Sequence, residues 1–190
     1  EYDIMSSVFQ AISNHPALDL KLAVTGAHLS ESFGYTIKDI KADGFFIAEE
    51  IESLPDDDKK SSRVVGLGIQ LQGLVKTVER IQPDILLVLG DREEAMATAL
   101  IGAYMDIPVA HISGGDRVVG NIDDQVRHAV TKLAHIHLTT NLKSKERILG
   151  LGEQPFRIHN VGNPGLDRLI NTPDLDLGEI SKNLNFRSIF

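Results

Sequence analysis

The 190-residue sequence contains no cysteine, which excludes disulfides, a thiol nucleophile and cysteine-ligated metal sites. It also lacks a long hydrophobic run. Its longest apolar stretches, such as ILLVLG at 85–90, are far shorter than the roughly 20 residues that span a membrane. No signal peptide is recognisable at its start. These absences predict a cytoplasmic protein without membrane contact.

The sequence has no excess of basic residues, because 27 acidic residues outnumber 19 basic ones and give a net charge of −8. Nucleic acids and anionic membranes need a basic surface, so we expect no general affinity for either. An anionic small molecule is still allowed, since its binding depends on local charge. With 42% hydrophobic residues, the chain is long enough for one sizeable core.

Two widespread catalytic motifs are also absent, the zinc motif HExxH and the phosphate-binding loop GxxxxGK[ST]. His135 and His137 lie two residues apart across an expected helix-to-strand junction and make a poor metal pair. We therefore predict no metal site.

Short runs rich in Val, Ile and Leu alternate with segments of helical period. We predict strands at 19–25, 84–89, 107–112, 136–140 and 157–161, and a further one near 44–49. We predict helices at 3–14, 62–82, 93–105, 122–135, 142–150 and 164–170. The alternation predicts an α/β fold, a Rossmann-like parallel sheet with right-handed crossovers and helices on both faces.

Polar residues follow three of the expected strands. Asp91 and Arg92 come after the second of them, SGGD at 113–116 follows the third, and TGAHLS at 25–30 follows the first. Ligands of such sheets bind beyond the carboxyl ends of the strands. We therefore expect these residues to meet at one edge of the sheet.

The segment HISGGDRVVGNIDDQVRH at 111–128 holds most of this chemistry. Its pair Gly114–Gly115 allows positive φ or a close approach of backbone to a ligand. Asn121 is the expected N-cap of the next helix, with Asp124 as its capping-box partner. On that helix Asp124 can meet His128, and Asp123 can meet Arg127, because each pair is four residues apart.

Two interpretations remain open for this segment: a well-capped helix with surface ion pairs, or a carboxylate cluster whose proton affinities are split by crowding. Asp91, arriving from the neighbouring strand, favours the cluster. It also remains open whether Asp91 caps its own helix. Glu93 and Glu94 are explained by the preference of acidic residues for a first helical turn.

Four motifs resemble the UDP-N-acetylglucosamine 2-epimerase family, most closely its hydrolysing branch, which makes N-acetylmannosamine for sialic-acid-type sugars. They are VTGAHLSESFGYTIKDI, ILLVLGDREEAMATAL, IPVAHISGGDRVVGNIDDQVRHAVTKLAH and VGNPGLDRL. The resemblance extends over nearly all of residues 1–170. The resemblance implies the N-terminal half of a glycosyltransferase-B-like (GT-B-like) two-domain fold, with the nucleotide sugar between the halves.

The resemblance also implies a domain division. Residues 1–171 correspond to the N-terminal Rossmann-like domain without the family's first strand, and residues 172–190 to a linker and the start of a truncated second domain. Both ends look cut from a longer protein, because Glu1 enters a helical pattern at once and Phe190 follows a polar, proline-containing stretch. The expected partners are the second domain of the same chain and a second copy in a homodimer.

Carried over residue by residue, the resemblance assigns catalytic roles to the carboxylates Asp91, Asp116, Asp123 and Asp124. The substrate-binding residues that we predict are Arg92, His28, His111, Ser113, Gly114, Gly115, Arg127 and His128. Many members of the family have a glutamate where this chain has Ser113, and we take Asp116 as its substitute.

The implied reaction converts UDP-N-acetylglucosamine to UDP and N-acetylmannosamine by anti elimination of UDP and hydration of 2-acetamidoglucal, with no metal or redox cofactor. Asp91 and Asp123 would be its base and acid, with Asp116 or Asp124 as alternates. The alternatives are an epimerase of a related UDP-2,4-diacetamido sugar, the non-hydrolysing epimerase, a glycosyltransferase of the same fold, or a non-catalytic nucleotide-sugar-binding domain. We expect this fragment alone to be inactive.

Overall fold

The computed structural model describes residues 1–55, 57 and 59–171 of the 190. Its strands are β1 (Leu22–Thr25), β2 (Ile47–Ile51), β3 (Leu86–Leu89), β4 (Val109–Ile112), β5 (Ile136–Thr139) and β6 (Ile158–Asn160). Its α-helices are α1 (Tyr2–Ser13), α2 (Ile37–Ala42), α3 (Lys60–Ile81), α4 (Glu93–Tyr104), α5 (Asp123–Leu133), α6 (Leu142–Gly150) and α7 (Pro164–Asn171). Short 3-10 turns occupy Gly26–Leu29, Glu31–Phe33 and Pro155–Arg157.

Every expected strand and helix forms, and the expected α/β fold is confirmed. Two details differ. The strand expected near 44–49 lies at Ile47–Ile51, and α2 was not expected, because its six residues are too few to display a helical period. The linker expected at 172–190 lies outside the described residues.

The described strands are all parallel, but their ladders form two sheets where we expected one. One sheet pairs β1 with β2, and the other runs β3-β4-β5-β6 in chain order. In the part of the chain that the structure describes, no strand joins β1 to β3, so both keep an unpaired edge facing the other.

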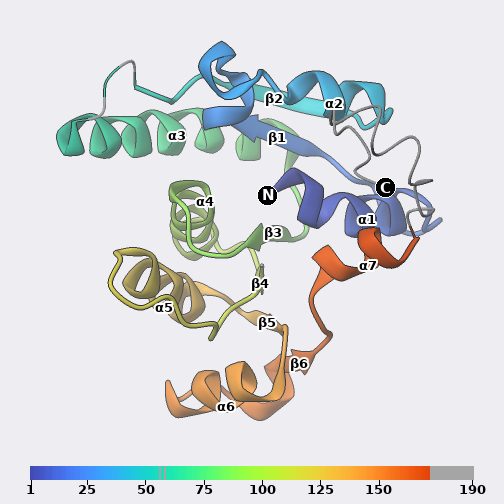
Figure 1. Cartoon of the computed structure of the whole chain (residues 1–190), viewed down its shortest axis with the longest axis vertical. Helices are drawn as coiled ribbons and strands as arrows, with labels where there is room; N and C mark the ends of the chain where they lie inside the picture. Colours follow the sequence, from blue (N-terminus) through green and yellow to red (C-terminus); the bar gives the residue numbers. More distant parts are fainter. Residues whose placement is uncertain (56, 58, 172–190) are drawn as a thin grey trace, which may run out of the picture.

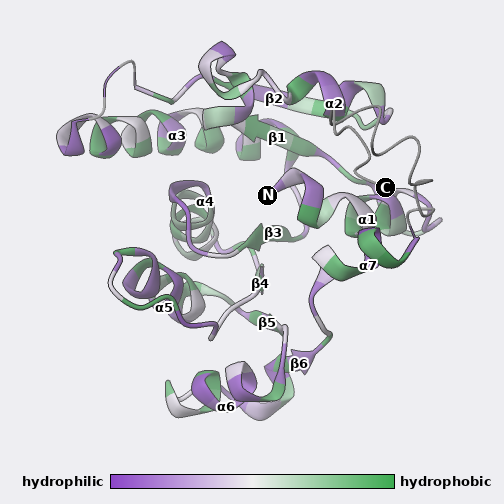
Figure 2. Cartoon of the chain, in the orientation of Figure 1, coloured by the Kyte–Doolittle hydropathy of each residue, from purple (hydrophilic) through white to green (hydrophobic). Residues whose placement is uncertain are grey.

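Helices cover both faces of these sheets. Figure 1 shows α4, α5 and α6 on one side of the β3–β6 sheet and the paired helices α1 and α7 on the other. β1 and β3 are hydrophobic strands, whereas β6 and the helices carry many hydrophilic residues (Figure 2). In the described residues no helix is both long and apolar enough to cross a membrane.

The packing of α4 on the sheet fixes the exit of β3. Ala95 and Ala99 of α4 share a buried core with Val88 of β3 and with Val109 of β4. A Cβ atom at Gly102 would overlap the Val109 side chain, so a glycine is needed where the helix lies closest to the strand. This core holds the β3–α4 junction, which carries Asp91, against the neighbouring strand.

Candidate active site at the strand ends

Asp91 directly follows β3 and points toward α5. Gly90 turns the chain with a φ of +73°. The carboxylate of Asp91 then accepts a hydrogen bond at Oδ2 from Nη2 of Arg127. The N-cap position of α4 is Arg92, with no side-chain capping bond. Asp91 therefore faces the neighbouring helix and does not cap its own.

Arg127 is buried at the centre of this arrangement. Its side chain is 10% exposed, and its Nη1 donates to the carbonyl oxygen of Ser113 at 2.9 Å. The same Nη1 lies 3.8 Å from Oδ2 of Asp116. The expected pairing with Asp123 is wrong, because Arg127 lies on the buried stripe of α5 that also carries Val130 and Thr131.

Asp116 is held from a second side by the start of α6. Its Oδ1 accepts hydrogen bonds from the hydroxyl of Thr140 at 2.7 Å, from the hydroxyl of Ser144 and from Nδ2 of Asn141 at 3.5 Å. Thr140 and Ser144 were not predicted from the sequence. The available signal was Asn141, which caps α6 by accepting from the Ser144 backbone N–H at 3.0 Å.

The backbone at 113–115 is unusually constrained. Ser113 has a φ of +62°, a left-handed conformation that costs a non-glycine residue free energy and is frequent at functional sites. Gly114 and Gly115 are buried, and a Cβ at Gly115 would overlap the carbonyl oxygen of Ser144. Gly115 has the positive φ that the sequence allowed, +76°, and the open sides of both glycines pack against α6 and the core.

His111 is a further correction. We expected it in the cleft, yet its side chain on β4 is fully buried. Its Nε2 donates to the Gly90 carbonyl at 2.7 Å, and its Nδ1 lies 3.3 Å from the Thr131 hydroxyl. Burial lowers the pKa of His111 to about 4, so the ring is neutral at pH 7. It ties the exit of β3 to β4 and α5 and does not reach a ligand.

The start of α5 carries the other two carboxylates. Asn121 is not its N-cap; the cap position is Ile122, and Nδ2 of Asn121 donates to Asp123 Oδ2 at 2.6 Å. Asp124 accepts from the Val118 backbone N–H at 3.2 Å, a bond that lowers the pKa of its carboxyl.

The expected pair of Asp124 with His128 is confirmed at 3.8 Å. Arg117, which we had not singled out, donates to Asp124 from Nε at 3.1 Å.

Arg92 and His28 lie beyond Asp91, toward β1. Arg92 is half exposed, with Nε 3.3 Å from a Glu1 oxygen and 3.7 Å from a Glu94 oxygen. Nδ1 of His28 lies 2.7 Å from the Thr36 hydroxyl, and burial lowers the pKa of the ring. Burial also raises the pKa of Glu94, so this residue is more than an exposed helix-start acid.

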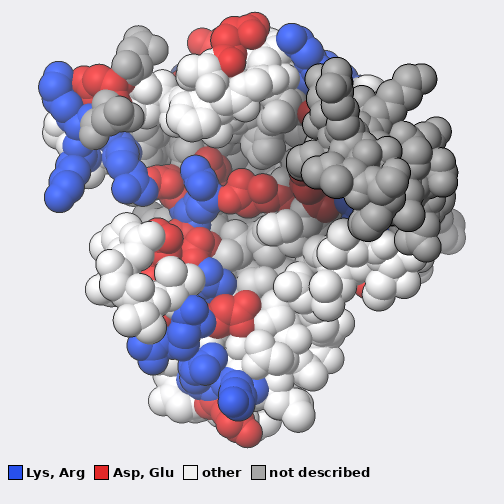
Figure 3. Space-filling model, viewed as in Figure 1, with Lys and Arg blue, Asp and Glu red and all other residues white. Residues whose placement is uncertain are grey.

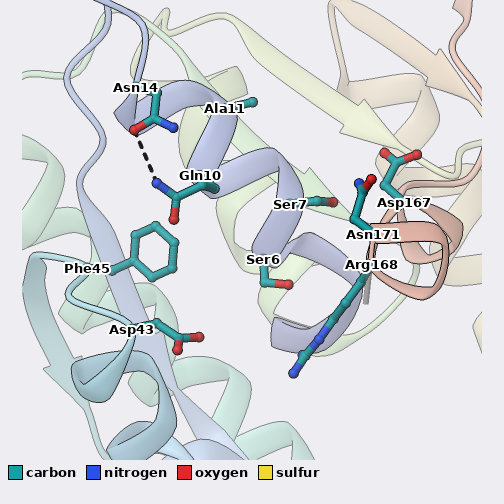
Figure 4. Close-up of a pocket in the computed structure, with 10 residues that line it drawn as sticks. All are labelled: Ser6, Ser7, Gln10, Ala11, Asn14, Asp43, Phe45, Asp167, Arg168 and Asn171. Atoms are coloured by element: carbon teal, nitrogen blue, oxygen red, sulfur yellow. Dashed lines mark hydrogen bonds between the residues drawn. The ribbon is translucent and has the colours of Figure 1, made fainter. Parts of the chain in front are cut away.

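Charged side chains lie along the middle of the face that Figure 3 shows. Acidic side chains follow the hollow between α3 and α4, and basic side chains stand among and below them (Figure 3). A separate polar pocket lies between α1, α7 and the segment before β2 (Figure 4). None of its lining residues belongs to the predicted site. Within the described ranges, no group of three or more acidic, histidine or cysteine side chains could hold a metal ion.

The geometry thus brings together three of the predicted residues, Asp91, Ser113 and Asp116, around a fourth, Arg127. Asp123 lies one turn before Arg127 on α5. The fold and this site define a Rossmann-like α/β domain with a charged site at the carboxyl ends of its parallel strands.

Comparison with known proteins shows the family within this class of fold to which the chain belongs. The chain belongs to the UDP-N-acetylglucosamine 2-epimerase family, whose model matches residues 10–189. It is 38% identical over 170 residues to the UDP-N,N'-diacetylbacillosamine 2-epimerase (hydrolyzing) of Legionella pneumophila, covering 90% of this chain and 45% of that protein. It is 32% identical over 187 residues to the GDP/UDP-N,N'-diacetylbacillosamine 2-epimerase (hydrolyzing) of Campylobacter jejuni, covering 98% and 48%.

Among solved structures, the UDP-GlcNAc 2-epimerase from Neisseria meningitidis bound to UDP-GlcNAc superposes with a TM-score of 0.76 at 19% identity. The match covers 97% of this chain and 49% of that one, so the described fold corresponds to one half of a GT-B-like protein. The chain spans about half the length of the curated relatives it matches.

Proposed function

We propose that the whole protein is a hydrolysing UDP-N-acetylglucosamine 2-epimerase that releases UDP and N-acetylmannosamine, a precursor of sialic-acid-type sugars. The observation that carries the proposal is the pair of carboxylates, Asp91 and Asp116, held on one buried arginine at the strand ends. A domain that only bound an anionic nucleotide sugar would gain nothing from such a concentration of negative charge.

The chemistry requires a base and an acid. The hydrogen on C2 of the sugar is not acidic, so inversion proceeds through cleavage of the C1–O bond. A base takes the C2 proton, the C–H electrons form the C1=C2 double bond, and UDP leaves with the electrons of the C1–O bond. Water then adds its oxygen to C1 of 2-acetamidoglucal, and a proton reaches C2 from the opposite face.

We assign the base to Asp91 and the acid to Asp123, with Asp116 or Asp124 as alternates. The hydrogen bonds that Asp91 accepts from described residues reach only Oδ2, which leaves Oδ1 for the sugar. Among the described residues, Asp123 accepts a hydrogen bond only from the side chain of Asn121, at the partly buried start of α5. Two carboxyl groups in such different surroundings suit opposite roles.

The remaining roles fall to residues around these carboxylates and to the second half of the protein. Arg92 is half exposed and next to Asp91, where its charge can balance the departing diphosphate. His28 and His128 border the same edge and are proposed to bind the sugar or its phosphates. The second domain would supply the other contacts to uridine and diphosphate.

A related UDP-2,4-diacetamido sugar is a second candidate substrate. Two relatives, at 38% and 32% identity, carry names that specify hydrolysing epimerases of diacetylbacillosamine nucleotides. The reaction at C1 and C2 is the same for both sugars, so the carboxylate assignment holds for either. Steady-state kinetics with both nucleotide sugars would decide between them, because the preferred substrate has the larger kcat/KM.

The decisive experiment incubates the full-length protein with UDP-N-acetylglucosamine in D2O and separates the products. We expect equimolar UDP and N-acetylmannosamine, with deuterium at C2. Formation of UDP-N-acetylmannosamine without free UDP would indicate the non-hydrolysing reaction, and unchanged substrate for both nucleotide sugars would refute the proposal. Residues 1–190 alone should be inactive, and robust turnover by them would contradict our division of the site between two domains.

We also propose how this half is completed. In the common doubly wound order 3-2-1-4-5-6, the first strand lies between the second and the fourth. The observed order, β2-β1 beside β3-β4-β5-β6, would follow it with one parallel strand added between β1 and β3. We expect slower amide exchange along β1 and β3 in the full-length protein than in residues 1–190.

We also propose that the whole protein forms a homodimer, which light scattering would test.

A further inference from the structure

Arg127 is the most completely buried cation of the site, and its guanidinium is shared among three acceptors. Nη2 donates to Asp91, which follows β3. Nη1 donates to the carbonyl of Ser113, which follows β4, and lies 3.8 Å from Asp116. Its Nε is buried and has no hydrogen-bond partner among the described residues. One side chain from α5 therefore touches the ends of two neighbouring strands.

We propose that Arg127 is a positioning residue that fixes Asp91 and Asp116 relative to each other, and that it does not contact the substrate. The inference rests on the proposed function and replaces the substrate-binding role that the sequence suggested. Arg127 takes one oxygen of Asp91, while the hydroxyls of Thr140 and Ser144 take one oxygen of Asp116. Asp116 is thus held on one oxygen by α6 and its preceding turn and faces Arg127 with the other, at 3.8 Å, while Asp91 is held by Arg127 on one oxygen.

The planar guanidinium of arginine is necessary to fix the two carboxylates relative to each other. It presents parallel N–H groups to acceptors on two different strands, whereas a lysine ammonium is a single point charge that cannot reproduce that geometry. The Ser113 carbonyl points at Nη1 from a left-handed residue with φ +62°, so the backbone conformation and the arginine fit each other. A misplacement of about 1 Å at a reacting group can cost about 100-fold in rate.

The test uses the full-length protein with Arg127→Lys and Arg127→Gln. Arg147→Gln is the matched control, because Arg147 Nη1 donates to the neighbouring Gly115 carbonyl at 2.9 Å but touches no carboxylate in the described structure. We expect both Arg127 variants to lower kcat by about 100-fold with KM within about threefold, since only the transition state depends on carboxylate placement. The control should keep kcat within about threefold.

The possible outcomes separate the two proposals. An active wild type with Arg127→Lys at normal kcat would overturn the positioning role, and a rise in KM alone would restore substrate binding by Arg127. An inactive wild type would refute the proposed function and leave the positioning claim to crystal structures of the variants. In those structures we expect the Asp91 carboxylate to rotate away from the site in Arg127→Gln. An unmoved Asp91 would overturn the inference even if Arg127→Gln unfolds more easily than the wild type.

Discussion

The two pairs of carboxylates in this chain occupy very different settings. Asp91 and Asp116 are anchored from behind, by the buried Arg127 and by the hydroxyls of Thr140 and Ser144. Asp123 and Asp124 lie partly buried in the first turn of α5, where their donors come from the residues just before that turn and from the preceding loop. The comparison indicates that contacts with distant segments hold one pair, whereas contacts with nearby residues hold the other.

The largest expected effect is on the anchored side. Asp91→Asn in the full-length protein should lower kcat by about 1000-fold, because an amide cannot take the C2 proton. Release of UDP, followed by a coupled assay, measures this. Asp19→Asn, which removes an exposed carboxylate paired with Lys21, is the matched control. Near-normal UDP release by Asp91→Asn would remove Asp91 from the mechanism.

The backbone beneath Asp116 gives the next largest effect. Gly115→Ala places a methyl group against the Ser144 carbonyl at a φ of +76°, so we expect a loss of about 3 kcal/mol in the free energy of unfolding. Gly120→Ala has a similar φ of +89° but open space around it, and should cost about 1 kcal/mol. Denaturant unfolding measures both. Equal losses would mean that the contact with α6 is unimportant.

Acid should lower the free energy of unfolding through His111, which holds the exit of β3. The unfolded chain takes up a proton on this ring below about pH 6.5, but the folded chain only near the lowered pKa of about 4. The free energy of unfolding therefore falls as the pH drops between these values, by at most about 3 kcal/mol from this ring. His111→Gln should remove that part of the pH dependence. Identical pH profiles for the two proteins would contradict the assignment.

The smallest effect is expected for Asp124, at the start of α5. Asp124→Asn loses its ion pair with Arg117, which is half exposed, and its contact with His128. Such surface pairs contribute little to stability. We expect kcat within about threefold of the wild type and an almost unchanged melting temperature. A loss as large as that of Asp91→Asn would reverse the comparison and make Asp124 the catalytic carboxylate.

The sequence alone predicted which strand–helix junctions form this site. The apolar run before Asp91 and the period of α5 were enough to place both junctions at one edge of a parallel sheet. It did not predict which side chains point inward. Every residue of β4 is buried, so alternation could not tell that His111 turns into the core. Arg127 falls in the same helical stripe as Val130 and Thr131, a signal that its charge is buried, yet pair spacing directed it to Asp123.

Contacts between segments distant in the chain could not be predicted from local patterns. Asp116 meets Ser144 across 28 residues, and Arg127 meets Asp91 across 36. The expected cap at Asn121 was wrong for a different, local reason. Asp123 takes the amide group of that side chain, while the chain enters α5 at Ile122 in a helical conformation that leaves no place for a capping bond.

The hydrogen bond between His111 and the Gly90 carbonyl has a practical consequence. Because a carbonyl oxygen only accepts, the neutral ring must carry its proton on Nε2, which fixes one tautomer. The nitrogen resonances of this imidazole therefore report on the geometry one residue before Asp91 without a label in the cleft. A mixture of tautomers after ligand addition would show that the hydrogen bond between His111 and the Gly90 carbonyl breaks when the ligand binds.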